Sequence, residues 1–190
     1  MRKLSVFMTL IVSLMAAGQS VWIDLNGNDL EGGYELSSSL SSASAIYYGV
    51  EAIRAEDEYE ESQFMVSALI WAVGATPIPG FSVGLGFKPL FAPIDLPKNY
   101  NVGAISVRAG IIYTLPIVIN TTIAAYYNIA PKALCISDCE RYDEWRLEAA
   151  LQPMDGGMIF AGFRNIDFKL DGGVKYEFNK AGYIGIRIIF

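Results

Sequence analysis

The feature that most constrains this chain is a period-two alternation of apolar and polar residues. Between Val102 and Tyr113, apolar or small residues occupy the odd positions, whereas Ser106 and Arg108 occupy even positions. The same alternation recurs in the segments 81–87, 117–128 and 144–151. Successive side chains of a β-strand point to opposite faces, so each segment predicts a strand with one apolar and one polar face.

Hydropathy narrows the fold class further. The chain has 190 residues, of which 53% are hydrophobic. Beyond the N-terminus, the best candidate for a spanning helix, 64–75, contains Ser67 and ends at Thr76-Pro77. It is much shorter than the ~20 residues that a bilayer requires. An apolar chain without a spanning helix predicts a soluble β core or a membrane barrel, in which apolar residues alternate with lumen residues.

The N-terminus has the pattern of a secretory signal peptide. Arg2 and Lys3 precede an apolar run over 4–17, and the small or polar residues Gly18, Gln19 and Ser20 follow. This pattern predicts a signal peptide in residues 1–20, with cleavage after Gly18 or after Ser20. The remaining residues, 21–190, are expected to form a single domain.

The spacing of strands and connections predicts a closed barrel. We expect about ten strands, near 21–26, 33–41, 45–54, 64–74, 81–87, 102–113, 117–128, 143–151, 158–168 and 183–190. Tight connections alternate with longer polar ones, the long ones being 55–63, 88–101, 129–142 and 170–182. Short inner turns and long outer loops are typical of an antiparallel up-and-down transmembrane β-barrel with an even strand number. Eight strands are the alternative.

The chain ends on an alternating strand. Ile184, Ile186 and Ile188 are expected to face lipid, and Tyr183, Gly185 and Arg187 to face inward. Phe190 at the end, with Ile188 two residues before it and Gly185 five before it, resembles the C-terminal signal of bacterial outer-membrane barrels. Tyr183, Gly185, Ile188 and Phe190 therefore predict an interaction with the barrel assembly machinery.

Four segments, mainly in the C-terminal third, suggest a family. The chain resembles the YfaZ family of small outer-membrane proteins at 125–127, 142–144, 161–164 and 182–190. The resemblance implies a barrel in the outer membrane of a Gram-negative bacterium, and it implies little about activity. The loop that contains Cys135 and Cys139 is an addition to the family pattern.

Charge and composition exclude several function classes. The chain has 14 basic and 20 acidic residues, a net charge of −6, which disfavours nucleic-acid binding. It contains no histidine, so catalysis by a Ser–His or Asp–His constellation is impossible. A Ser–Lys pair stays conceivable, although the lysines lie mostly in predicted loops. We expect no enzyme, no cofactor and no metal site.

Charged residues on the inward face predict a network in the lumen. It comprises Glu51, Arg108, Glu144, Arg146, Glu148, Arg164 and Arg187. A barrel of about ten strands has a narrow interior, so long paired side chains can fill it. We favour this plugged barrel over a constricted pore whose arginines attract anions. Glu144 and Glu148 as the paired carboxylates of a glycoside hydrolase are a weaker alternative to ion pairing.

Three loop features carry further expectations. Cys135 and Cys139 predict a disulfide in an oxidising compartment. The acidic stretch 56–61 is read as a solvated outer loop, with divalent-cation binding as the alternative. Asp24, Asn26, Asn28 and Glu35 match four positions of an EF-hand loop, but Asp29 stands where that loop has glycine, so a hairpin tip is favoured.

These observations favour an integral outer-membrane barrel without enzymatic activity, either structural or a narrow pore. We expect it to contact outer-membrane lipids as a monomer. The alternative is a binding module that presents its outer loops to a surface partner or to cations. A membrane-embedded hydrolase is the least favoured function.

Overall fold

The computed structural model describes residues 18–27, 29–56, 62–96, 99–117 and 119–190. Most of the predicted signal peptide and most of the acidic stretch 56–61 lie outside the described residues. No helix within the described ranges is long and apolar enough to cross a membrane.

The described chain consists almost entirely of antiparallel strands. Ten long strands form the wall: β1 (Gly18–Asn26), β2 (Asp29–Ser41), β3 (Ser44–Glu56), β4 (Ser62–Ala75), β5 (Phe81–Asp95), β6 (Asn99–Leu115), β7 (Asn120–Ala130), β9 (Cys139–Met154), β10 (Gly157–Leu170) and β11 (Lys175–Ile189). The connection from β7 to β9 contains a short 3₁₀ helix, η1 (Lys132–Leu134), and a short strand, β8 (Cys135–Ser137), which pairs with β6.

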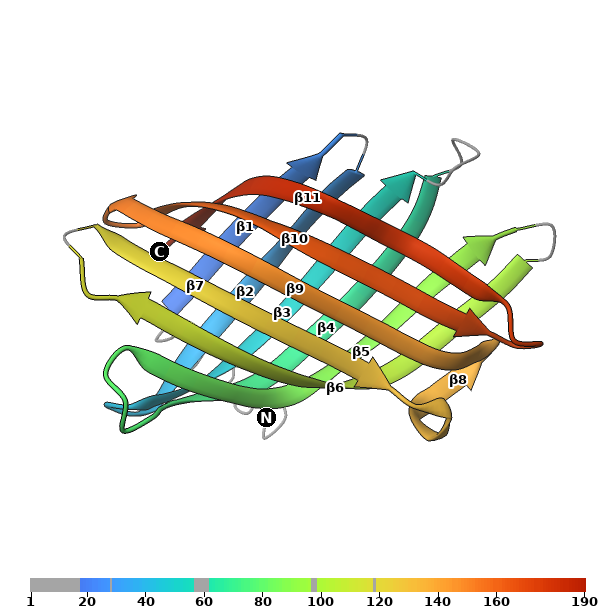
Figure 1. The fold of residues 1–190 in the computed structure, drawn as a ribbon, viewed down its shortest axis with the longest axis horizontal. Coiled ribbons are helices and arrows are strands. Elements are labelled where there is room, and N and C mark those ends of the chain that lie inside the picture. The colour runs from blue at the N-terminus through green and yellow to red at the C-terminus, as the bar shows by residue number, and fades with distance from the viewer. Residues whose placement is uncertain (1–17, 28, 57–61, 97–98, 118) are drawn as a thin grey trace, which may run out of the picture.

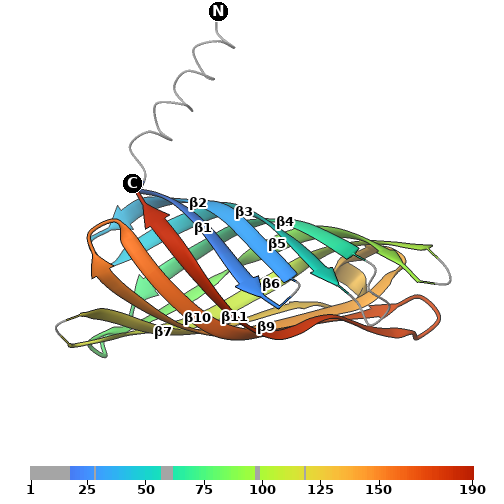
Figure 2. The ribbon, with the colours of Figure 1, turned by 90° about the horizontal axis from the view of Figure 1, so that it is seen from above.

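The sheet closes on itself. Each long strand pairs antiparallel with its sequence neighbour, and the first strand, β1, pairs with the last, β11, over Ser20–Leu25. Figure 1 shows the tilted wall from the side, and Figure 2 shows it turned by 90°. The predicted up-and-down barrel is therefore confirmed, with ten strands rather than the alternative of eight.

The two ends of the barrel differ. The chain enters at Gly18 and ends at Phe190 on one end, which we call the turn side, together with the β2–β3, β4–β5, β6–β7 and β9–β10 connections. Gly156 has φ +77° in the β9–β10 turn, a conformation that suits glycine in a two-residue hairpin. The opposite end, the loop side, carries the other hairpins and β8.

Toward the turn side, the wall is apolar outside and largely polar inside. In β11, Ile184, Ile186 and Ile188 are exposed, whereas Tyr183 is buried and Arg187 lines a lumen cavity. In β6, Ser106 and Arg108 point inward between exposed Ile105 and Val107. Apolar residues outside and polar residues inside are the reverse of the arrangement in a soluble protein and are typical of a membrane barrel.

Two of the predicted long loops are wrong. The segment 88–101 is mostly strand, because β5 continues to Asp95 and β6 begins at Asn99. The segment 170–182 is also mostly strand, because β11 begins at Lys175. In both places the inward residues become apolar. The outward residues of β11 become polar, as Lys175, Glu177 and Lys180 show, whereas Pro89, Phe91 and Pro93 keep the outward face of β5 apolar.

Sixteen buried residues fill the loop side of the lumen, and we call them the loop-side core. They are Ile53, Ala55, Met65, Leu90, Ala92, Ile94, Tyr100, Val102, Ala104, Ala130, Cys139, Tyr142, Ile166, Phe168, Leu170 and Phe178. This end of the barrel thus has an apolar interior, as a water-soluble β-protein does, and its exterior carries both charged residues such as Arg141 and apolar ones such as Phe91 and Ile136.

Candidate functional site

Charged side chains meet in the middle of the lumen, directly below the loop-side core. Glu144 on β9 is fully buried and has four partners. Its carboxylate accepts hydrogen bonds from Lys88 Nζ at 2.7 Å, Arg146 Nε at 2.7 Å, Asn128 Nδ2 at 2.9 Å and the Tyr142 hydroxyl at 2.5 Å. Such charge-assisted bonds offset the cost of burying a carboxylate.

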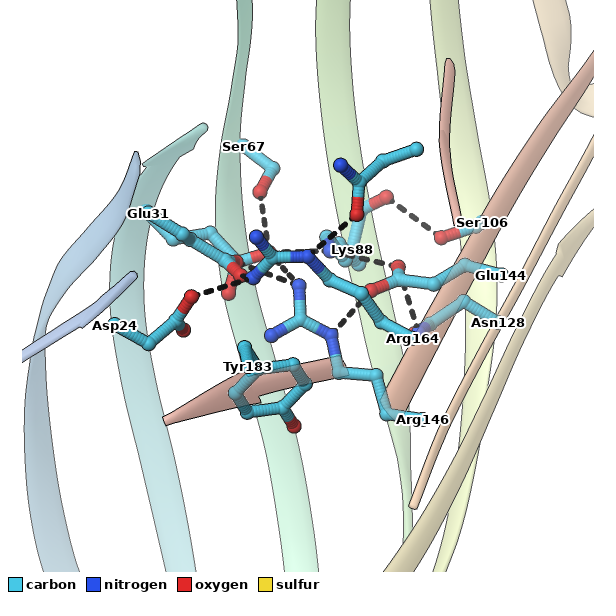
Figure 3. A network of polar contacts seen from close by, with 12 residues as sticks. Asp24, Glu31, Ser67, Lys88, Ser106, Asn128, Glu144, Arg146, Arg164 and Tyr183 are labelled. Atoms are coloured by element: carbon cyan, nitrogen blue, oxygen red, sulfur yellow. Dashed lines mark hydrogen bonds and ion pairs between the residues drawn. The ribbon is translucent and has the colours of Figure 1, made fainter. Parts of the chain in front are cut away.

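Two arginines extend this layer toward β1 and β2. Arg146 Nη2 lies 2.5 Å from Glu31 Oε1. Arg164 is also fully buried, pairs with Glu31, and lies 2.8 Å from Asp24 Oδ1 through Nη1. Figure 3 shows the Arg146 and Arg164 guanidinium groups meeting the Asp24 and Glu31 side chains. Residues far apart in the sequence thus share one ion-pair layer.

Lys88 completes the layer from β5. It is fully buried, pairs with Glu51 as well as Glu144, and Glu51 accepts a further hydrogen bond from Ser67 at 2.9 Å. We call Asp24, Glu31, Glu51, Lys88, Asn128, Tyr142, Glu144, Arg146, Arg164 and Asn179 the lumen network.

Sequence reasoning missed three charged members of this network, besides Asn128, Tyr142 and Asn179. It assigned Lys88 to a loop and Asp24 to a hairpin tip, and it gave Glu31 no role. The structure places Asp24 within β1, facing inward with 1% of its surface exposed. The inward position of Lys88 could have been predicted, because Lys88 follows Gly84 and Gly86 at steps of two residues and these glycines face inward in the same strand.

Three residues that the sequence placed in the charge network lie outside the lumen network. Glu148 and Arg187 face each other at 4.0 Å, and the Tyr183 hydroxyl donates to Glu148 at 3.3 Å. Arg108 has no ion pair among the described residues. Its guanidinium lies 4.8 Å from the Trp71 ring centroid and 4.4 Å from that of Tyr126, which are cation–π contacts.

Below the lumen network, toward the turn side, the lumen opens into a cavity of about 160 Å³. Its lining includes Glu35, Trp71, Arg108, Tyr126 and Arg187. A second cavity of about 250 Å³ reaches the turn-side mouth at Gly18 and Ile189. Glu35, Tyr47, Met158 and Arg187 line both cavities, so they adjoin and we call them together the turn-side vestibule.

The remaining predictions concern the cysteine pair and the acidic segments. Cys135 and Cys139 lie in side-chain contact without a disulfide bond between them, so the disulfide stays a prediction. Among the described residues, no group of three or more Cys, Asp or Glu side chains could hold a metal ion. Asn28 and most of the acidic stretch lie outside the described residues.

Comparisons with known proteins find similar solved structures but no matching family. Neither a family profile nor a curated protein matches the sequence. The crystal structure of the outer membrane channel DcaP of Acinetobacter baumannii aligns with 90% of this chain and 72% of its own, at 6% identity and a TM-score of 0.44. A structure from work on in-meso crystallization of membrane proteins aligns with 92% and 83%, at 8% identity and a TM-score of 0.41.

Proposed function

We propose that this chain is an integral outer-membrane β-barrel without enzymatic activity, and that its lumen is plugged in the resting state. One observation carries the proposal: the lumen is filled by two successive layers of its own side chains. The lumen network crosses the middle of the barrel, and the loop-side core fills the end beyond it.

The exterior supports insertion into a bilayer. Exposed apolar side chains surround the barrel, among them Val21, Ile23, Leu85, Phe87, Ile111, Leu147, Leu151, Ile159, Ile184 and Ile186. Such a continuous apolar surface is unfavourable in water and favourable against lipid tails.

Aromatic pairs lie at both borders of this apolar band. On the loop side, Trp145 stacks on Phe163 with centroids 5.2 Å apart. Trp145 lies two residues after the half-buried Asp143 on the outward face of β9. On the turn side, Phe81 stacks on Tyr113 at 4.4 Å. Aromatic side chains favour the membrane–water interface, so the two pairs support a spanning orientation with the band between them.

The chemistry of the lumen supports a non-enzymatic role. Glu144, one half of the candidate carboxylate pair, has no exposed surface, and its oxygens already accept four hydrogen bonds. A general acid or nucleophile must reach its substrate, and Glu144 is closed off by its own partners.

Two finer assignments belong to the same proposal. We propose cleavage of the signal peptide after Gly18 rather than Ser20, because Gln19 exchanges backbone hydrogen bonds with Phe190 and accepts one from the Tyr34 hydroxyl. We also propose membership of the YfaZ family, which rests on the four C-terminal segments alone.

Planar-bilayer recording of the purified full-length protein tests the plugged lumen. We expect currents at the lipid baseline, because the side chains of the lumen network and of the loop-side core occupy the lumen in two successive layers. Heat-modifiable gel mobility of protein recovered from the same vesicles verifies that the barrel is folded and inserted. Reproducible single-channel steps from inserted wild-type protein would contradict the plug, and recovery from the soluble periplasm would contradict the location.

A further inference from the structure

The turn-side vestibule contains two charged groups of opposite sign that the protein leaves unpaired. Arg108 is 7% exposed, and within the described chain its guanidinium has ring contacts but no hydrogen bond or ion pair. Glu35 is half-buried and lines the same cavity; no described side chain forms a hydrogen bond or ion pair with it, and Arg187 and Arg108 are the opposite charges that act on it across the cavity. Charges removed from bulk water are ordinarily paired directly, so both groups can accept a ligand of opposite charge.

Most of the other charges that face this cavity are engaged. Asp24 pairs with Arg164, Glu51 with Lys88, and Arg146 with Glu31 and Glu144. Arg187 and Glu148 face each other at 4.0 Å, and the Arg187 Nε atom has no hydrogen-bond partner among the described residues. Within the described chain, Arg108 and Glu35 are therefore the two lining charges without an ion pair, and Arg187 is a weakly paired cation beside them.

Arg108 is held in a fixed position. Its guanidinium lies over the Trp71 ring of β4 and the Tyr126 ring of β7, and these two rings contact each other edge to face with centroids 5.6 Å apart. The Nε atom has no hydrogen-bond partner. A planar guanidinium held by stacking is preorganised to bind a carboxylate with little loss of side-chain entropy.

We propose that the turn-side vestibule binds a small zwitterion of the amino-acid type, with its carboxylate on Arg108 and its ammonium group toward Glu35. A simple anion would satisfy Arg108 but add negative charge beside Glu35, and a simple cation would do the reverse beside Arg108. A zwitterion satisfies both groups at once. The small volume of the cavity suits a ligand of a few heavy atoms.

The side of entry follows from the two cavities. The second cavity leads to the mouth at Gly18 and Ile189, while Asp24, Glu51 and Arg146 of the lumen network line the first cavity at its inner end. If the barrel lies in the outer membrane as proposed, this mouth faces the periplasm. The vestibule is then a blind, one-ended site, and binding there does not depend on whether the lumen conducts.

Isothermal titration of the full-length protein in detergent micelles at neutral pH tests this inference with three matched probes. Alanine is the zwitterion, propionate lacks its ammonium group, and ethylamine lacks its carboxylate. We expect saturable binding of alanine that is at least about tenfold tighter than that of either analogue, because each analogue lacks one of the two charged contacts.

Variants assign the binding to the two residues. Arg108→Met and Glu35→Gln should each weaken alanine binding by about tenfold or more, and Glu35→Gln should not weaken propionate binding. Arg141→Met, at an exposed arginine on the loop side, should leave all three affinities unchanged. Arg108→Lys keeps the charge, so it replaces Arg108→Met if heat-modifiable mobility shows that the latter is not folded.

Three results would overturn the inference. No saturable heat with alanine would mean that the vestibule holds water only. Equal affinity for propionate and alanine would remove the role of Glu35. Unchanged alanine binding in folded Arg108 and Glu35 variants would place the ligand elsewhere.

Discussion

At the residue scale, the two glutamates of β9 that the sequence treated alike have different environments. Glu144 has four hydrogen-bonding partners and no exposed surface. Glu148 has one weak hydrogen bond, from Tyr183, and faces Arg187 at 4.0 Å beside the vestibule. Position on an inward face predicts burial, but it does not reveal how many partners the other strands bring.

Replacement of each glutamate by alanine should separate these roles. Glu144→Ala leaves Lys88 and Arg146 without a shared partner, so we expect the free energy of unfolding to fall by about 3–5 kcal/mol. Glu148→Ala should cost less than about 2 kcal/mol, because cavity water can solvate Arg187. Urea unfolding in lipid vesicles, followed by gel mobility, measures both. Equal losses would show that Glu144 is not the centre of the network.

At the element scale, the loss of alternation along β5 explains why the loop prediction failed there. In Phe81–Phe87 the inward residues are serine or glycine and the outward residues are apolar. Beyond Lys88 the inward residues are Leu90, Ala92 and Ile94, all buried, while Pro89, Phe91 and Pro93 point outward. Both faces of the strand are therefore apolar up to Asp95, and a search for alternating polar and apolar residues ends the strand at Lys88.

The loop-side ends of the strands should therefore contribute to stability as a core does. Leu170→Ala, at a fully buried residue that the sequence assigned to the start of a loop, should cost about 2–5 kcal/mol. Val174→Ala in the exposed β10–β11 turn is the matched control and should cost less than about 0.5 kcal/mol. The same unfolding measurement compares them. Similar small effects would indicate that the loop-side core does not stabilise the barrel.

At the scale of the whole molecule, closure depends on the backbone of the last strand. The backbone N–H of Phe190 donates to the Gln19 carbonyl at 2.8 Å, while its side chain is 75% exposed. The ring thus contributes little to the packed interior. If Phe190 is read during assembly, its side chain matters before the barrel closes rather than afterwards.

Phe190→Ser should separate assembly from stability. We expect less protein in the outer membrane, with the free energy of unfolding of the assembled fraction changed by less than about 0.5 kcal/mol. Glu177→Ser, at a loop-side residue that is also exposed, should keep wild-type yield. Quantitative blotting of membrane fractions and urea unfolding measure the two quantities. A wild-type yield for Phe190→Ser would remove Phe190 from the predicted assembly signal.

The sequence by itself determined the barrel, because strand alternation is a local property: residues such as Ser106, Arg108, Ile184 and Ile186 show which face each strand turns outward. Only the tertiary structure decided which charges meet. Lys88, Glu31 and Arg164 come from β5, β2 and β10, and their contacts depend on strand order, tilt and register across the lumen. The unpaired state of Arg108 and Glu35 is likewise a property of the closed interior, because a side chain lacks a partner only once every neighbouring strand is in place.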